Sequence, residues 1–353
     1  MLDYTETQAR QTGGKRVRRE DRQAGIGICL PEVRQEVHLQ EKGADVKPGI
    51  FPNISFADYI ADKLGDVPTL SSSIAHVLLT QSPHHAWFSH PRLNPNHQPD
   101  EAEIADIGSV AHHVLLAGDT RAIVLIDAKD YRTNAAKEAR DAARANGGIP
   151  LLQHKLAAVN DIVIAAKDYL ANSEIAGIFD DGAAEQTILW QEMFLAQHGE
   201  AQGRRQDGVW CRARPDWLSG DKRTMLHYKT TAGTAEPGAW IRSHLALDGY
   251  DVSLAFYERG LSMFEQSKRE LRSIFLIQEQ EPPYACSLVG LDPAMQDLAS
   301  RKVNRAINLW ADCLAKDRWP AYPGHIAYAE PAAWMMQQED ERELRNFMLG
   351  GQA

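Results

Sequence analysis

The chain reads Arg214-Pro215-Asp216 and then, after an intervening turn, Leu226-His227-Tyr228-Lys229-Thr230-Thr231, and these two runs decide its fold. Side chains alternate between the two faces of a strand, and both runs fit that period. Ser219-Gly220-Asp221-Lys222 between them has the composition of a hairpin turn. We therefore expect neighbouring strands that bring Asp216 and Lys229 to a shared face. With a third ligand beside them, a carboxylate and an ammonium group suit a metal-dependent phosphodiesterase site.

Basic residues are concentrated around these two strands, although the chain as a whole is acidic. The formal net charge is −10, which is unlike a nucleic-acid binder, but the local field matters more than the net charge. We expect one strand over about residues 208–218, with Arg212, Arg214 and Asp216 on one side. Arg204-Arg205 and Lys222-Arg223 add to the positive charge. A locally basic cleft on an acidic body is the interpretation, with Arg212 and Arg214 as candidate substrate contacts.

The bulk composition is that of a globular protein with a sizeable core. The chain has 353 residues, 44% hydrophobic and 24% charged. It has no apolar run of about 18 residues and no signal-peptide pattern, so we expect neither a membrane span nor export, and a cytoplasmic location. The four cysteines form no CxxC pair, which argues against a zinc ribbon or a disulfide framework.

Three parts follow from the pattern along the chain. Residues 1–48 are polar, carry the basic run Lys15-Arg16-Val17-Arg18-Arg19 and lack apolar periodicity, so we expect a disordered arm. That basic run could touch DNA, although a solvated tail is the simpler interpretation. Residues 49–325 are expected to form one domain, and residues 326–353 a helical tail.

Within the domain the order of elements predicts an α/β fold with a mixed sheet. We expect helices over about residues 74–81, 104–116, 133–146, 151–171, 237–260 and 293–316, and strands over about residues 186–194, 208–218, 224–230, 273–280 and 284–289. Helices therefore precede the strands and flank the sheet.

The order of these motifs resembles the PD-(D/E)XK nuclease superfamily, in particular its exodeoxyribonuclease VIII-like branch. The resemblance rests on Gly108-Ser109-Val110-Ala111-His112, on the two strand motifs, and on Gly249-Tyr250-Asp251 leading to Tyr257. It extends from about Phe51 to Pro323. It implies a restriction-endonuclease-like core with a helical N-terminal elaboration.

The resemblance also implies roles for individual residues. His112 and Asp216 would bind a divalent metal, Mg²⁺ or Mn²⁺, while Lys229 would orient the attacking water and stabilise charge on the phosphate. His112 could instead be a helix residue that packs against its neighbours, and Lys229 an ordinary solvated lysine. Tyr257 would contact substrate, although a tyrosine on an apolar helix face is as often part of the core.

Two positions depart from the superfamily pattern. His227 stands where the second acidic residue of the motif is expected, and imidazole suits softer metals than Mg²⁺. His227 is therefore either a substitute ligand or an inactive position. Ser253 occupies the place of a glutamine four residues before Tyr257 and would reach less far toward a substrate. Glu192, a charged residue among apolar ones, either compensates at the metal or lies at the exposed end of its strand.

The resemblance implies a metal-dependent exonuclease acting on double-stranded DNA ends in recombination or repair. Its members often form homo-oligomeric rings and work beside a single-strand annealing protein. The alternative is a catalytically degenerate DNA-binding or assembly subunit that keeps the fold. His227 could also be a recent substitution among active relatives.

Overall fold

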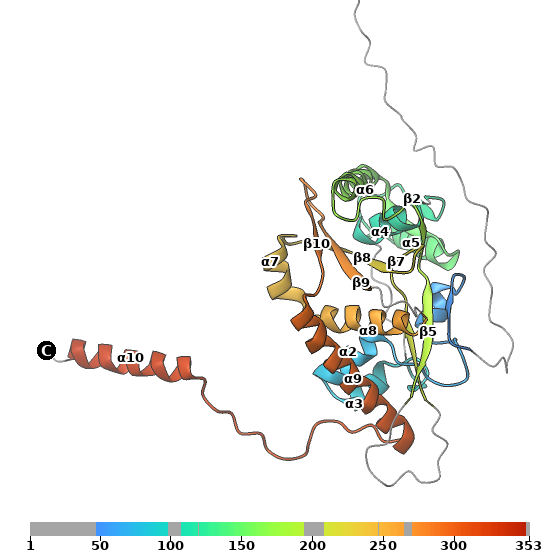
Figure 1. The fold of residues 1–353 in the computed structure, drawn as a ribbon. Coiled ribbons are helices and arrows are strands. Elements are labelled where there is room, and N and C mark those ends of the chain that lie inside the picture. The colour runs from blue at the N-terminus through green and yellow to red at the C-terminus, as the bar shows by residue number, and fades with distance from the viewer. Residues whose placement is uncertain are drawn as a thin grey trace, which may run out of the picture. The chain divides into compact units, whose positions relative to one another are not determined.

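The computed structural model describes residues 47–97, 107–118, 120–193, 208–245, 247–264 and 270–350 (Figure 1). The predicted arm up to residue 46 and the pair Arg204-Arg205 lie outside these residues. No helix in the part of the chain described has both the length and the apolar character needed to cross a membrane.

Helices α1 to α4 follow one another near the start of the described chain, and strands β4 to β8 follow one another near its middle. The strands are β1 (Gly49–Phe51), β2 (Ile123–Ile126), β3 (Ile149–Leu152), β4 (Gly182–Ala184), β5 (Thr187–Glu192), β6 (Val209–Ala213), β7 (Trp217–Ser219), β8 (Thr224–Thr231), β9 (Arg272–Glu279) and β10 (Cys286–Val289). The helices are α1 (Phe56–Ile60), α2 (Ser72–Thr80), α3 (Pro83–Ser89), α4 (Ile107–Ala117), α5 (Asn134–Ala145), α6 (Leu156–Ala171), α7 (Pro237–Trp240), α8 (Tyr250–Ser262), α9 (Pro293–Lys316) and α10 (Ala333–Gly350), with the short turns η1 (Gln153–Lys155) and η2 (Ile241–Leu245).

The central sheet is mixed, as the sequence predicts. Its five strands run in the order β10-β9-β8-β7-β4, with β8 and β9 parallel and the other pairs antiparallel. A second, three-stranded sheet has the order β1-β5-β6, and β2 pairs with β3 in parallel. The predicted α/β fold with a mixed sheet flanked by helices is therefore confirmed.

The predicted strand over residues 208–218 is wrong as a single element. It divides at Arg214-Pro215-Asp216, so that β6 pairs with β5 in one sheet and β7 pairs with β8 in the other. Proline has no N–H to donate to a ladder and tends to interrupt strands, which accounts for the break. The division matters for function because Arg212 and Asp216 do not belong to one strand face.

Two further predictions differ at glycine or proline. The helix expected over 237–260 is interrupted, and α8 begins after Gly249, whose φ of +75° is favoured by glycine. Residues 149–152 form β3 before α6 begins, because Pro150 fits an extended segment. The helix predicted at 293–316 agrees with α9, which Asp292 caps by accepting from the Met295 N–H.

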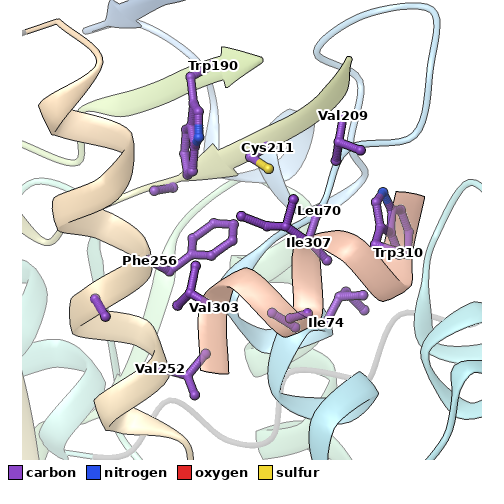
Figure 2. Packing of buried hydrophobic residues seen from close by; sticks show 14 of the residues in the cluster. Leu70, Ile74, Trp190, Val209, Cys211, Val252, Phe256, Val303, Ile307 and Trp310 are labelled. Atoms are coloured by element: carbon purple, nitrogen blue, oxygen red, sulfur yellow. The ribbon is translucent and has the colours of Figure 1, made fainter. Parts of the chain in front are cut away.

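Two apolar clusters fill the space on the two sides of β7 and β8. One contains buried side chains of α2, α8 and α9 packed on β5 and β6, among them Ile74, Val252, Phe256 and Ile307 (Figure 2). The other packs α4 and α6 against the opposite side chains of β7, β8 and β9. Alternation along β8 divides its residues between these clusters, since Met225 belongs to the first and Leu226 and Tyr228 to the second.

Candidate metal centre

Helix α4 places His112 against β8, the middle strand of the central sheet. The helix buries Val110, Ala111 and Val114 against α6 and the sheet, which sets its rotation. The His112 ring lies over Tyr228 of β8, with 6.0 Å between ring centroids. Its Nε2 atom is 3.2 Å from Oδ2 of Asp216. The structure therefore brings His112 and Asp216 together, and their roles as metal ligands stay a prediction.

Asp216 lies immediately before β7 and directly after Pro215. Its Oδ2 accepts a hydrogen bond of 2.8 Å from the backbone N–H of Tyr228, which ties β7 to β8. Burial alone would raise the pKa of Asp216, but the Lys229 ammonium and the His112 side chain outweigh it and hold that pKa well below its usual range. Asp216 is therefore a carboxylate at neutral pH.

Glu185, which is not among the residues predicted from the sequence, joins these two residues. One nitrogen of His112 and one carboxylate oxygen each from Glu185 and Asp216 lie within 4.8 Å of one another. Glu185 occupies the turn between β4 and β5, and its backbone N–H donates to the Asp216 carbonyl over 3.0 Å. A glutamate beside a turn is usually solvated, so no signal in the sequence distinguished it. We call His112, Glu185 and Asp216 the metal group.

The metal group offers a donor set that suits a divalent cation. Two carboxylates and an imidazole supply hard oxygen and borderline nitrogen ligands, which Mn²⁺ and Mg²⁺ sites combine with water. All three side chains are partly buried, so they are held in place and still meet solvent. These residues fit the metal that the superfamily resemblance implies.

Lys229 and His227 flank the metal group on β8. After the effect of burial, the Lys229 ammonium has the largest effect on the pKa of Asp216, and it lowers that pKa. His227 is buried, and its Nε2 is 3.0 Å from Oγ of Ser273 on β9. Burial, reinforced by the Lys229 charge and opposed by Asp216, lowers the pKa of His227 to about 4, so the imidazole is neutral at pH 7.

Residues 93–331 match a protein family described as a PDDEXK-like domain of unknown function (DUF3799). The chain belongs to this family. The resemblance to the PD-(D/E)XK nuclease superfamily is thereby confirmed. The match ends just before α10, in which residues 333–349 are exposed.

Two solved structures resemble this PDDEXK-like domain at a distance. One is a candidate exonuclease from Eubacterium rectale, with a TM-score of 0.42 and 8% identity, covering 76% of this chain and 92% of that protein. The other is the protein SSO0001, with a TM-score of 0.29 and 11% identity, covering 72% of this chain and 87% of that protein. No curated protein matches the chain.

The two arginines predicted to contact substrate are held inside this PDDEXK-like domain. Arg212 is 4% exposed, and its Nη1 is 2.9 Å from Oδ1 of Asp62 and donates to the Thr69 carbonyl. It therefore lies out of reach of a DNA backbone, which contradicts its predicted role. Arg214 donates from Nε to Oε2 of Glu185 over 2.5 Å, so it positions a member of the metal group.

Glu192 lies at the end of β5 and is committed to another partner. Its Oε1 accepts from Nε of Arg259, its Oε2 accepts from Nη2 of the same residue over 2.8 Å, and Oε1 also accepts from the Trp190 indole. The structure does not bring it to the metal group, so the suggestion that Glu192 compensates there is wrong. A charged residue on an apolar strand face is here explained by a salt bridge.

Tyr257 and Ser253 of α8 lie on the His227 side of β8. The Tyr257 ring contacts the His227 ring, with 5.0 Å between centroids at an interplanar angle of 44°. Burial raises the pKa of Tyr257 far above its usual range, so its hydroxyl stays protonated. Ser253, one turn earlier, is partly buried. Their predicted contact with substrate stays a prediction.

Proposed function

We propose that this chain is a metal-dependent DNA exonuclease of the exodeoxyribonuclease VIII type, acting on double-stranded DNA ends. The observation that supports it is the convergence of His112, Glu185 and Asp216 within 4.8 Å, with the Lys229 charge acting on Asp216. In a family of PDDEXK-like domains, this is the combination that phosphodiester hydrolysis needs. Processing of DNA ends in recombination or repair is the corresponding role.

Each residue has a chemical task in this proposal. The metal group binds Mg²⁺ or Mn²⁺, which when bound supplies a Lewis acid and an activated water. Lys229 orients that water and offsets the negative charge that develops on the scissile phosphate. Tyr257 keeps the His227 ring in place beneath the strand, and Arg214 keeps Glu185 turned toward Asp216. Hydrolysis would leave a 5′-phosphate.

The proposed DNA substrate is a duplex end. The proposed protein partners are further copies of this chain and a single-strand annealing protein. A homo-oligomeric ring would keep the chain on DNA through successive cuts, and a single-strand annealing protein would use the single strand that is released. Light scattering of the full chain tests the ring directly. A monomer at all concentrations would remove that part of the proposal and leave the chemistry untouched.

The test of the chemistry is digestion of end-labelled linear duplex DNA in Mg²⁺ or Mn²⁺. We expect nucleotide release by the native chain and loss of about 10²-fold or more in Lys229→Ala. Lys316→Ala is the matched control, because Lys316 is an exposed lysine at the end of α9. Equal activity of the native chain and Lys229→Ala would contradict the assigned role.

The second candidate is a catalytically degenerate DNA-binding or assembly subunit. The observation in its favour is His227, a neutral and buried imidazole bonded to Ser273 at the position of the motif's second acid. His227→Asp separates the two candidates. If only that variant digests DNA, the native chain is a degenerate nuclease; if the native chain digests DNA, His227 is compatible with turnover.

A further inference from the structure

We infer that Glu185 supplies the second carboxylate of the metal site, and that His227 is not a ligand; this rests on the proposed function. The acid has in effect moved from β8 to the turn between β4 and β5. Both positions neighbour β7, which begins directly after Asp216. On one side β7 pairs with β8, which carries His227, and on the other side it pairs with β4, which directly precedes Glu185.

His227 is held away from the metal group by two kinds of contact. Its Nε2 shares a hydrogen bond with Ser273, and its ring packs against Tyr257 and Phe275, with centroid distances of 5.0 and 5.4 Å. Among the described residues, its nitrogens are not part of the group in which ligand atoms lie within 4.8 Å. The imidazole therefore fills a packed space between β8, β9 and α8.

Glu185 is held toward the metal group by its surroundings. Arg214 donates to its Oε2, and the same guanidinium donates from Nη1 to the Ile54 carbonyl and to Oγ1 of Thr187. A carboxylate has about four lone-pair sites, so the pairing with Arg214 leaves capacity for a cation. Arg214 thus acts as a positioning residue for Glu185.

The backbone at Glu185 supports a specific purpose for this residue. Its φ is +57°, a left-handed conformation that is uncommon for a glutamate and persists only where the surroundings maintain it. The hydrogen bond from its N–H to the Asp216 carbonyl is one of those constraints. A glycine or asparagine would adopt this turn more readily, so the conformation alone does not account for a glutamate here.

The relocation restores the number of carboxylates that the motif normally supplies. Two oxygen donors with one imidazole favour Mn²⁺ and Mg²⁺ over the softer ions that a pair of imidazoles would select. The site would then keep its metal preference although the motif position on β8 has lost its acid. Metal preference can be measured by metal binding alone, without hydrolysis of DNA.

The experiment is Mn²⁺ binding measured by electron paramagnetic resonance on the full chain, with and without Mg²⁺ as competitor. We expect Glu185→Gln to bind Mn²⁺ at least about tenfold more weakly, since a ligand charge is lost. The matched control is Glu138→Gln, an exposed glutamate of α5, which should bind as the native chain does. His227→Asn should also bind within about twofold of native.

The double variant Glu185→Gln with His227→Asp is the sharpest comparison. Returning the acid to β8 should recover Mn²⁺ affinity that Glu185→Gln alone has lost. Unchanged Mn²⁺ binding in Glu185→Gln overturns the inference, as does a tenfold loss in His227→Asn or the absence of Mn²⁺ binding by the native chain. Thermal melting of each variant without metal shows whether it is folded. If Glu185→Gln does not fold, Mn²⁺ binding by His227→Asn still tests whether His227 is a ligand.

Digestion of duplex DNA in parallel separates this inference from the proposed function. If Mn²⁺ binding depends on Glu185 but no variant and no native chain cuts DNA, the site assignment stands and the nuclease proposal fails. If the native chain cuts DNA and Glu185→Gln cuts equally well, the nuclease proposal stands and the inference fails.

Discussion

Two histidine–aspartate pairs in this protein have nearly the same geometry and opposite surroundings. Nε2 of His112 is 3.2 Å from Asp216, and Nε2 of His90 is 3.4 Å from Asp62. The His112 and Asp216 side chains are 28% and 15% exposed, whereas His90 and Asp62 are both 0% exposed. A short His–Asp distance therefore does not identify a functional site, and access to solvent separates the two.

The sealed pair belongs to a structural cluster of Asp62, Thr69, His90 and Arg212, which we call the Asp62 cluster. Asp62 accepts from the Thr69 N–H over 2.9 Å and from the Thr69 hydroxyl over 2.6 Å, and it pairs with Arg212. The carboxylate is thus satisfied by protein donors and has a cation beside it. In the metal group, two carboxylates instead approach one imidazole, an arrangement that a divalent cation stabilises.

The largest contrast should come from Asp216→Asn in the metal group. We expect DNA digestion to fall by on the order of 10²- to 10³-fold or more, because the central charge of the site is lost. The free energy of unfolding should fall by less than it does for Asp62→Asn, since the Asp216 side chain is 15% exposed and the Asp62 side chain is 0% exposed. Digestion of end-labelled duplex and urea unfolding measure the two quantities. Full activity in Asp216→Asn would place the chemistry elsewhere.

The same substitution in the Asp62 cluster should have the opposite outcome. Asp62→Asn leaves the buried Arg212 without its counter-charge, which typically costs about 3–5 kcal/mol of unfolding free energy. The fraction that remains folded should bind Mn²⁺ as the native chain does. Urea unfolding followed by fluorescence of the buried tryptophans gives the stability. A change below about 0.5 kcal/mol would show that the cluster is not structural.

The order of motifs in the sequence predicted the pairing of His112 with Asp216 across a long stretch of chain. The helix that presents His112 and the strand that carries Lys229 are local patterns that folded as expected. The strand predicted over residues 208–218 instead divides at Arg214-Pro215-Asp216. The assembly of these elements follows from the superfamily topology. The mixed sheet was predictable as well, because β8 and β9 contain continuous buried runs of strand length.

Glu185, Arg212 and Glu192 were beyond prediction because their roles depend on partners distant in sequence. Arg212 and Arg214 are two apart, and both guanidinium groups lie over the Tyr59 ring, at 5.4 and 5.7 Å. One reaches Asp62 and the other Glu185 only because of where α1 and the β4–β5 turn lie. Period-two alternation gives the face of a residue and not the partner found there.

Arg214 and Arg212 allow the metal group and the Asp62 cluster to be compared again, through the residues that bond their carboxylates. Arg214→Lys should weaken Mn²⁺ binding about 10- to 100-fold, as loss of a group that orients a ligand does, because lysine cannot bond Glu185, the Ile54 carbonyl and Thr187 at once. Arg212→Lys should leave Mn²⁺ binding unchanged and lower the melting temperature. Titration with Mn²⁺ and thermal melting of both variants decide. Equal effects of Arg214→Lys and Arg212→Lys on Mn²⁺ binding would contradict the separate roles of the metal group and the Asp62 cluster.

The smallest effect expected is a difference in acid sensitivity. Burial alone would raise the pKa of Asp62, but His90, Arg212 and Thr69 hold it below the ordinary value of 3.8. A carboxylate with a lowered folded pKa contributes stability that is present above its unfolded pKa and is lost as pH falls through the folded one. The unfolding free energy of Asp62→Asn should therefore decline less than that of the native chain between about pH 5 and pH 3. Asp297→Asn on the exposed surface of α9 is the control, and parallel pH profiles for native and Asp62→Asn would contradict the linkage.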